Sequence, residues 1–529
     1  MRNLKSILYN KKEMFYVIIL FLFSVSVNQY YGNLGVCPID SFWFFNSGYD
    51  ALNGYYPFKD YWTIAGPFIT FFQAILFKIF GVSWFSYVFH ASIFNFLISI
   101  ATFYTLYKFR LNTHYCFLYA LLISVIAYPS AGTPYVDHHA SILSIISLLF
   151  FILAIKTNSR GYWFFIPIIL IISFLTKQTP TGNIFLIIVV LSSMYFIINF
   201  DIKKIFSGIL GSFIIISFFF LILFLTKIPF ESFYVQYISF PLEIGKIRVE
   251  SFLFPLEFSR IFLRFKLIHI PLLIMIFISI QKVRNDSNYL RSNDFIIVLS
   301  LVASSYALIA HQLITINGMF VFFIIPIITG FAHIYYLEHY KKKNYFLYSF
   351  IILAICSTVY YGYKYIHKRD FMDLRKANFN QTIDAKIFDN KLSGLNWISC
   401  HYPDNPKKEV SNLLKAINLI KDDKRKKSII TEYQFISVIL SIYDYSPTQV
   451  WFINHVVNQE KNSKYFKSYK KLLIDQIDKN NIEIVYLIKP FWADNKIFEK
   501  GLNKNCYKKI ELTEILDAYL LQDCDELKN

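Results

Sequence analysis

A candidate catalytic carboxylate, Asp40, follows the first long apolar run of the chain, in the stretch IDSFWFFNSGYDALNGYYPFKDYWTIAGP (39–67). A carboxylate beside a membrane span must be solvated or paired. Asp40 is therefore either a solvated loop acid or a general base that takes a proton from an acceptor hydroxyl at the membrane surface. Asp60, in PFKDYW, is more typical of a structural residue that caps or braces the turn before the next helix.

A second polar group lies in YPSAGTPYVDHHAS (128–141), where Asp137 and His138 stand at the expected start of a helix. An acid and a histidine could bind a divalent cation, although two adjacent residues do not complete a metal site. The alternative is structural, with Asp137 as the helix N-cap and His138 in a hydrogen bond. The sequence leaves these two interpretations open.

A third polar group lies in FLTKQTPTGN (174–183), at another expected helix end. Lys177 could simply extend its ammonium towards water. The helix break at Pro180 and Gly182, together with the amide of Gln178, instead favours a contact with the phosphate of a lipid.

Basic residues also occur among apolar stretches of the long loop 227–266, at Lys246, Arg248, Arg260 and Arg264. If this loop is external, they run against the tendency of Lys and Arg to remain inside. Either the loop is long enough to escape that tendency, or these residues bind anions such as lipid headgroups or a diphosphate. His311 and Gln312, at a further helix end, could join them.

The composition indicates a polytopic membrane protein, with 55% hydrophobic and 19% aromatic residues among 529 and repeated apolar runs of membrane-spanning length. The formal net charge is +18. Its Lys and Arg residues fall in short clusters between apolar runs and in the C-terminal region, which indicates membrane orientation and argues against nucleic-acid binding. The first apolar run lacks a cleavage site of small residues, so we expect a retained helix rather than a signal peptide.

We expect about eleven transmembrane helices within residues 1–363, with 68–80 as a helix at the outer surface. The expected spans are 15–30, 85–107, 115–127, 140–155, 162–175, 183–200, 205–225, 267–280, 295–313, 319–336 and 345–363. With this assignment all six basic clusters between spans, including the N-terminal one, lie on the cytoplasmic side. The first loop (31–67), Asp137, Lys177 and the loop 227–266 then lie outside.

The remainder, 364–529, is polar and is predicted to form a soluble external α/β domain. Residues 428–430 and 482–488 have the pattern of buried strands, while 407–419, 434–442 and 463–477 have helical periodicity. The domain contains no Gly-rich phosphate loop and no nucleophile elbow, so we assign it no catalytic role. It contains Cys400, Cys506 and Cys524, two of which could form a disulfide whose pairing the sequence leaves open.

The first loop resembles that of the GT-C membrane glycosyltransferases, in particular the bacterial relatives of protein O-mannosyltransferases and of lipid A aminoarabinose transferases. In those proteins an acid precedes the pattern A-x-x-L-x-G-x-x-P-[FY]-x-D and then G-P, and here the matching residues are Asp40, Ala51, Leu52, Gly54, Pro57, Phe58, Asp60, Gly66 and Pro67. The DHHAS and TKQTPTG stretches are similar to sequences of the same superfamily. Two departures are Ser41, where many relatives carry a second acid, and Ala65, where a Lys-Pro commonly precedes the surface helix.

The resemblance implies an enzyme of the bacterial cytoplasmic membrane that transfers a hexose or pentose from a polyprenyl-phosphate-linked donor. Transfer would occur on the external face, with inversion, to a glycan or lipid of the cell envelope. By position, Asp40 would be the catalytic base, Asp137 and His138 would lie near the donor phosphate or a divalent cation, and Lys177 would contact the phosphate.

Two other function classes remain open from the sequence. One is non-catalytic binding or transport of a lipid-linked saccharide, which would use the external cations but would not need Asp40. The other is a polysaccharide polymerase or ligase of a different membrane fold, which would have no reason to carry the pattern of 40–67.

Overall fold

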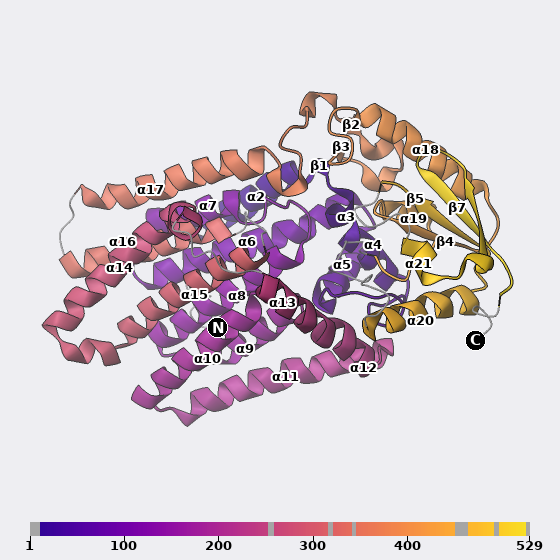
Figure 1. Cartoon of the computed structure of the whole chain (residues 1–529). Helices are drawn as coiled ribbons and strands as arrows, with labels where there is room; N and C mark the ends of the chain where they lie inside the picture. The colour runs from indigo at the N-terminus through magenta and orange to yellow at the C-terminus, as the bar shows by residue number, and fades with distance from the viewer. Residues whose placement is uncertain are drawn as a thin grey trace. The chain divides into compact units, whose positions relative to one another are not determined.

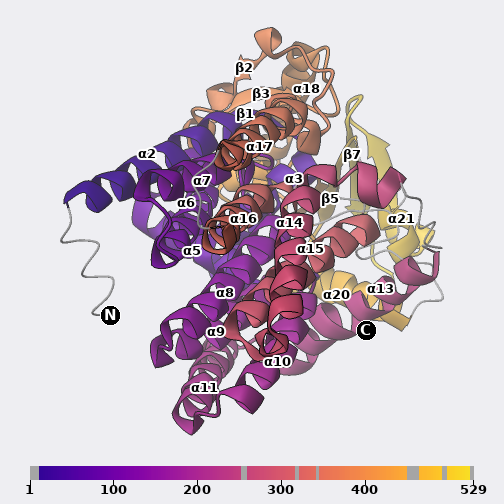
Figure 2. The same ribbon diagram turned by 90° about the vertical axis from the view of Figure 1, so that its left-hand side faces the viewer.

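The computed structural model describes residues 11–251, 259–315, 321–340, 345–449, 464–490 and 497–524. The chain forms two compact units, each assembled from three separate stretches (Figures 1 and 2). Unit 1 comprises Met1–Gly32, Val88–Leu221 and Val249–Phe371, and unit 2 comprises Asn33–Tyr87, Ile222–Arg248 and Met372–Asn529.

Unit 1 consists of helices, because its apolar runs can satisfy their backbone hydrogen bonds internally only as helices. The long elements that lie mainly in it are α2 (Lys11–Gly32), α6 (Trp84–Lys108), α7 (Thr113–Ile126), α8 (Val136–Thr157), α9 (Arg160–Phe174), α10 (Thr181–Ile198), α11 (Ile202–Thr226), α14 (Lys266–Asn285), α15 (Asn293–Thr315), α16 (Ile324–Tyr340) and α17 (Phe346–Tyr361). Each of the eleven predicted spans therefore corresponds to a helix.

Nine helical segments among the described residues are long and apolar enough to cross a membrane. The shorter apolar helices α7 and α9 correspond to two further predicted spans, so the count of eleven, which depends on both crossing, stays a prediction. α8 is central to the unit, because 83% of its 18-residue apolar stretch is buried inside the structure, whereas 17% of the corresponding stretch of α11 is buried. α8, α9 and α10 pack against one another and lie side by side in Figures 1 and 2.

The end of α2 approaches the turn before α8 more closely than a side chain would allow. Gly132 has a positive φ of 78°. A Cβ on Gly132 would lie 2.7 Å from the Cα of Gly32. Asn28 holds the same contact by donating its amide to the Gly132 carbonyl at 3.0 Å. Glycine is thus required here both for backbone conformation and for space.

The first loop is not a free loop, because it folds together with the C-terminal part of the chain in unit 2. After β1 (Leu34–Val36), α3 (Pro38–Ser41) and α4 (Trp43–Leu52), it ends in α5 (Pro67–Phe80), which packs on α4. α5 is the helix expected at 68–80. A three-residue strand cannot satisfy its own backbone groups, and β1 pairs in parallel with β3 (Asn396–Ser399).

β1 and β3 lie on opposite sides of the predicted domain boundary at residue 363, which stays a prediction, yet they belong to the same unit. Three further contacts join the same two stretches: the Trp62 N–H donates to the Pro447 carbonyl at 2.8 Å, the Tyr443 hydroxyl donates to the Asp60 carbonyl at 3.1 Å, and the Tyr55 and Tyr443 rings stack 3.7 Å apart. Because these partners lie almost 400 residues apart, hydropathy along the sequence could not show the grouping.

The C-terminal stretch has the predicted α/β character. It contains β2 (Ile383–Asp384), β3, α18 (Pro406–Asp422), β4 (Lys427–Thr431), α19 (Phe435–Leu440), α20 (Lys464–Lys479), β5 (Ile484–Ile488), α21 (Ile497–Gly501), β6 (Tyr507–Glu511) and β7 (Leu516–Leu521). A small sheet has the order β1-β3-β2, and a four-stranded sheet, orange to yellow in Figure 1, has the order β4-β5-β7-β6. β4 and β5 are parallel, and β7 is antiparallel to both of its neighbours. A disulfide joins Cys506 to Cys524, a pairing that the sequence left open.

The long loop 227–266 is largely helical rather than irregular. It contains α12 (Phe230–Phe233), the π-helix Tyr234–Ser239, α13 (Phe240–Ser251) and a second π-helix, Ser259–Leu263. Gln236 ties its first part to the first loop, donating to the Phe58 carbonyl at 3.0 Å and accepting from the Thr63 N–H at 3.1 Å. The stretch expected to be a long external loop therefore has regular helical structure in its described parts.

Candidate functional site

Three polar residues of unit 1 meet at the start of α8: Asp137 of α8, His311 of α15, and Lys177 of the connection between α9 and α10. The Lys177 ammonium lies 2.6 and 2.7 Å from the two carboxylate oxygens of Asp137. The Nε2 atom of His311, in the last turns of α15, lies 3.2 Å from Oδ1 of the same carboxylate. Asp137 and His311 are buried, whereas the side chain of Lys177 is 22% exposed. The cluster is therefore a buried carboxylate held by two donors, one of which reaches the surface.

Hydroxyl groups fix the loop that carries Lys177. The Ser173 hydroxyl, in the last turn of α9, donates to the Ala140 carbonyl of α8 at 2.9 Å and lies 2.7 Å from the Thr181 hydroxyl of α10. Thr181 in turn donates to the Lys177 carbonyl at 3.0 Å. These bonds hold the ends of α9 and α10 against α8, and they explain why Lys177 reaches Asp137 although 40 positions separate the two residues.

His138 is adjacent to Asp137 in sequence but makes different contacts. Its Nε2 atom lies 2.7 Å from the Ser130 hydroxyl, and its ring packs edge-on against Phe371. The sequence left two interpretations of this pair open, a cation site or a helix cap with a hydrogen bond. His138 makes the hydrogen bond of the second interpretation. Asp137 lies in the first turn of α8, but it pairs with Lys177 and His311 and does not cap the helix.

Asp137 and His138 do not fit a divalent-cation site in this arrangement. Lys177 and His311 already engage both oxygens of Asp137, and Ser130 engages His138. Within the described ranges, no three His, Cys, Asp or Glu side chains are grouped to hold a metal ion.

Asp40 lies in unit 2, in the four-residue helix α3, and is half-buried. Neighbouring Ser41 is fully buried; its hydroxyl accepts from the Cys37 N–H at 3.0 Å and donates to the Met372 sulfur at 3.4 Å. A second acid at position 41 would thus be placed in an enclosed and partly apolar setting. Asp40 is the more accessible of the two side chains.

Asp60 has the predicted structural role. Its carboxylate accepts from the Tyr56 N–H at 2.7 Å, and Lys59 lies 3.6 Å from it. The turn before α5 is therefore braced by this side chain.

The basic residues of the long loop do not form one described cluster. Lys246 and Arg264 are exposed, and the latter's guanidinium lies 5.8 Å from the Phe265 ring centre. The side chains of Arg248 and Arg260 lie outside those that the structure describes. Gln178 is half-buried beside Lys177, and Gln312 accepts from the Val321 N–H at 3.4 Å. Their expected anion binding stays a prediction.

A buried carboxylate pair in unit 2 was not predicted from the sequence. The Asn46 amide lies 3.2 Å from an oxygen of Asp50 and 3.2 Å from an oxygen of Asp444, and Gln449 also donates to Asp50. Burial raises the pKa of Asp444 to about 7, and burial together with the nearby Asp444 raises that of Asp50. A lone acid on a short aromatic helix gives no sequence signal of a partner almost 400 positions away.

Arg369 is a second residue that the sequence did not single out. Its guanidinium, fully buried, donates to the carbonyls of Pro129, Ser130 and Ala131 at 3.0, 3.2 and 3.0 Å. These bonds hold the loop before α8, which includes Ser130, whose hydroxyl contacts His138. A single arginine in a polar stretch just beyond the last span looks like an ordinary interfacial charge in the sequence.

Comparisons with known proteins find only distant structural likeness. No family model matches the chain. No curated protein sequence matches it significantly. Among solved structures, an oligosaccharyltransferase from Archaeoglobus fulgidus in the apo form has a TM-score of 0.45 at 12% identity, over 94% of this chain and 72% of that one. The archaeal oligosaccharyltransferase AglB from the same organism, in complex with an inhibitory peptide and a dolichol-phosphate, has a TM-score of 0.41 at 12% identity, over 97% and 74%. Superposition this loose assigns neither a fold nor an activity to this chain.

Proposed function

We propose that this protein is a membrane glycosyltransferase that moves a sugar from a polyprenyl-phosphate-linked donor to a glycan or lipid of the bacterial cell envelope. The observation that carries the proposal is the cluster of Asp137, Lys177 and His311, which places an oriented cation at one end of a helical bundle. The positive-inside pattern favours the external face for that end. The acid and glycine-proline pattern of 40–67 supports the same enzyme class.

Lys177 is suited to a phosphate contact because its geometry leaves part of its ammonium available. An ammonium has three N–H donors, and two suffice for the two oxygens of Asp137. The third can point to the exposed side of the residue. In this role Asp137 positions Lys177 and does not itself touch the donor, which revises the phosphate or metal contact implied by the resemblance.

Asp40 is proposed as the general base. It removes the proton of the acceptor hydroxyl as that oxygen attacks the anomeric carbon of the donor sugar. The bond between the anomeric carbon and the phosphate oxygen breaks, and the polyprenyl phosphate leaves with the bonding pair. Lys177 stabilises the charge that develops on the phosphate. A single displacement inverts the anomeric configuration, and no step in this scheme requires a metal ion.

The test is an envelope glycan analysis of a deletion strain complemented at matched protein levels with wild type, Asp40→Asn or Asp60→Asn. The two variants make the same change of charge in the same loop. Asn at position 60 can still accept from the Tyr56 N–H, so Asp60→Asn should keep activity. We expect one sugar to be missing from the deletion strain and from the Asp40→Asn strain, and restored in the other two.

Binding of the donor separates catalysis from transport. Asp40→Asn should change affinity for a polyprenyl-phosphate sugar by no more than a few-fold while transfer is lost, because a base acts in the transition state. Full restoration of the glycan by Asp40→Asn would refute the base role and favour binding or transport of a lipid-linked saccharide.

A further inference from the structure

A pocket of about 830 Å³ opens in unit 1 at the other ends of the helices that carry the Asp137 cluster. α8 begins next to Asp137 and ends at this pocket, 22 residues later, which corresponds to about 33 Å along a helix. The lining residues come from the connections between α8 and α9 and between α10 and α11, and from the start of α15. They include Lys156, Asn158, Arg160, Asp201, Lys203 and Lys204.

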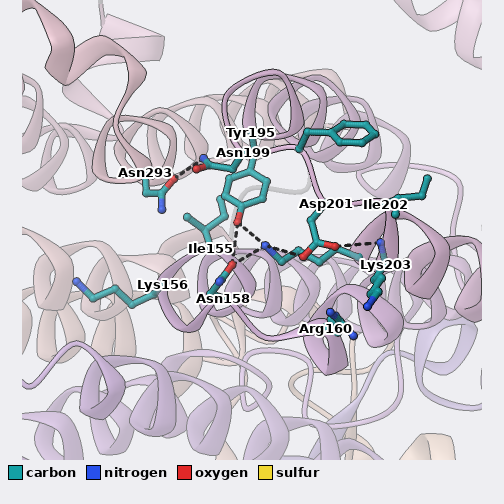
Figure 3. Close-up of a pocket in the computed structure, with 12 residues that line it drawn as sticks. Ile155, Lys156, Asn158, Arg160, Tyr195, Asn199, Asp201, Ile202, Lys203 and Asn293 are labelled. Atoms are coloured by element: carbon teal, nitrogen blue, oxygen red, sulfur yellow. Dashed lines mark hydrogen bonds and ion pairs between the residues drawn. The ribbon is translucent and has the colours of Figure 1, made fainter.

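The pocket is strongly cationic. Among its described lining residues, four carry a positive charge and one, Asp201, carries a carboxylate. Figure 3 shows Lys156 on one side of the pocket and Arg160 with Lys203 on the other. These three side chains are exposed and therefore available to a ligand. α9 begins at Arg160 and α11 at Ile202, so the positive ends of two helix dipoles add to the same field.

One of the cations that line the pocket, Lys204, is buried and held by hydrogen bonds. Lys204 is 4% exposed, and its ammonium donates to the Asn158 amide oxygen and, at 3.1 Å, to the Tyr195 hydroxyl. Asp201 lies 3.5 Å away and accepts from the Lys203 N–H at 3.0 Å. This carboxylate is therefore engaged by Lys204 and by the helix start, and the described lining residues keep a net positive charge.

We propose that this pocket binds a phosphate-bearing anion, supplied either by the headgroup of an anionic phospholipid or by free phosphate. The packing brings basic residues of two connections to one cavity, which membrane orientation by itself does not require. Phe200 and Ile202, which also line it, are 75% and 61% exposed, an apolar rim that suits acyl chains. A basic pocket between helix ends is a known setting for lipid phosphate groups.

The test uses the full chain in a neutral detergent and measures binding of phosphatidylglycerol, with phosphatidylcholine as the uncharged comparison. Arg160→Gln with Lys203→Gln removes two exposed pocket charges and leaves buried Lys204 in place. Lys11→Gln with Lys12→Gln removes two exposed charges from the start of α2, outside the pocket, and is the matched control. We expect roughly tenfold or greater weakening in the pocket variant and little change in the control.

A second arm titrates inorganic phosphate. If millimolar phosphate stabilises wild type or competes with phosphatidylglycerol for it, and the pocket variant loses this effect, the source is free phosphate. If phosphatidylglycerol binds and phosphate does not, the source is the lipid. Equal weakening in both double variants, or no binding of either probe to wild type, would overturn the proposal. Because this site does not include Asp40 or Lys177, its failure leaves the proposed transferase function untouched.

An independent observation concerns two cysteines of unit 2. Cys37 directly follows β1 and Cys400 directly follows β3, in neighbouring parallel strands where Val36 pairs with Ser399. The Cys400 N–H donates to the Val36 carbonyl at 3.2 Å, and the two thiols are in hydrogen-bond contact. That contact, with burial, raises the pKa of Cys37, while Cys400 is partly exposed.

We infer that Cys37 and Cys400 form a second disulfide, which fastens the segment carrying Asp40 to β3. The partly exposed Cys400, reacting as its thiolate, attacks the disulfide of an external thiol oxidase to give a mixed disulfide. The sulfur of Cys37 then displaces the oxidase thiol. The two protons of Cys37 and Cys400 end on the two sulfurs of the oxidase, which is reduced to a dithiol as the new disulfide forms, so that electrons and atoms balance.

The test is alkylation of protein prepared without reductant from native membranes, followed by peptide mass mapping. We expect a linked peptide pair that contains Cys37 and Cys400 and that Cys400→Ser abolishes. The Cys506 to Cys524 bond is the internal control for an oxidising compartment. Alkylation of both Cys37 and Cys400 in molecules whose Cys506–Cys524 bond is intact would overturn the inference. Alkylation of all four cysteines would overturn it and would also contradict the external placement of the C-terminal domain.

Discussion

The ammonium of Lys177 lies 2.6 Å from Oδ1 and 2.7 Å from Oδ2 of Asp137. The two partners differ in burial, because Asp137 is enclosed and Lys177 reaches the surface. A buried charge that loses its partner is costly, whereas an exposed one can be hydrated. The two halves of this ion pair should therefore respond differently to mutation.

Lys177→Met should destabilise the protein more than Asp137→Asn. The first leaves the buried carboxylate with His311 as its one remaining partner in the cluster, at a cost on the order of 3 kcal/mol, and the second leaves an ammonium that can turn to water. Thermal unfolding in detergent measures both. The double variant should be more stable than Lys177→Met alone, and strictly additive losses would show that the pair does not act as a unit.

Stability of unit 2 should fall as pH rises through the titration of Asp444. Burial raises the pKa of this carboxyl from 3.8 to about 7, so the folded state binds its proton more tightly than the unfolded state. The favourable contribution is complete below pH 4 and is lost as the pH approaches and passes 7. Asp444→Asn should remove this dependence of stability on pH. The melting temperature of the variant should therefore rise relative to that of wild type between pH 5 and 7.5.

Asp423→Asn is the matched control for that measurement. Despite partial burial, hydrogen bonds from Arg425 lower the pKa of Asp423 to about 2, so its titration lies below the tested window. This variant should keep the wild-type slope between pH 5 and 7.5. Parallel curves for Asp444→Asn and wild type would mean that Asp444 is ionised throughout.

Arg369→Met should destabilise unit 1 by about 3 kcal/mol or more, because three buried carbonyls lose a charged donor. Arg369→Lys should recover little, since one ammonium cannot reproduce the planar fork that spans consecutive carbonyls. Unfolding temperatures of the two variants test this. A lysine variant as stable as wild type would show that charge, rather than geometry, holds the loop before α8.

Removing the disulfide between Cys506 and Cys524 should lower the stability of unit 2 by about 3 kcal/mol, as expected for a loop of this length. Urea unfolding of a Cys506→Ser and Cys524→Ser double variant, compared with wild type, measures the loss. An unchanged unfolding midpoint would mean that the sheet edge β6–β7 is held by its hydrogen bonds alone.

The sequence determined the helices of the membrane part and most elements of the C-terminal stretch. An apolar run of membrane length forms a helix wherever it occurs, because the backbone hydrogen bonds close within the run. The apolar periodicity of 406–422 and the buried strands at 427–431 and 484–488 are likewise local properties. The structural role of Asp60 was also readable, since its partner lies four positions away.

Tertiary structure alone decided which polar residues meet. Asp137 was a candidate for a cap, a metal ligand or a phosphate contact, and only the packing of α8, α9 and α15 selected Lys177 and His311 as its partners. The same packing separated His138 from its neighbour. The pairing of β1 with β3 and the contact between Asn46 and Asp444 join residues more than 350 positions apart. Such contacts depend on shape and on the hydrogen bonds that buried groups must make, and neither is a property of the local sequence.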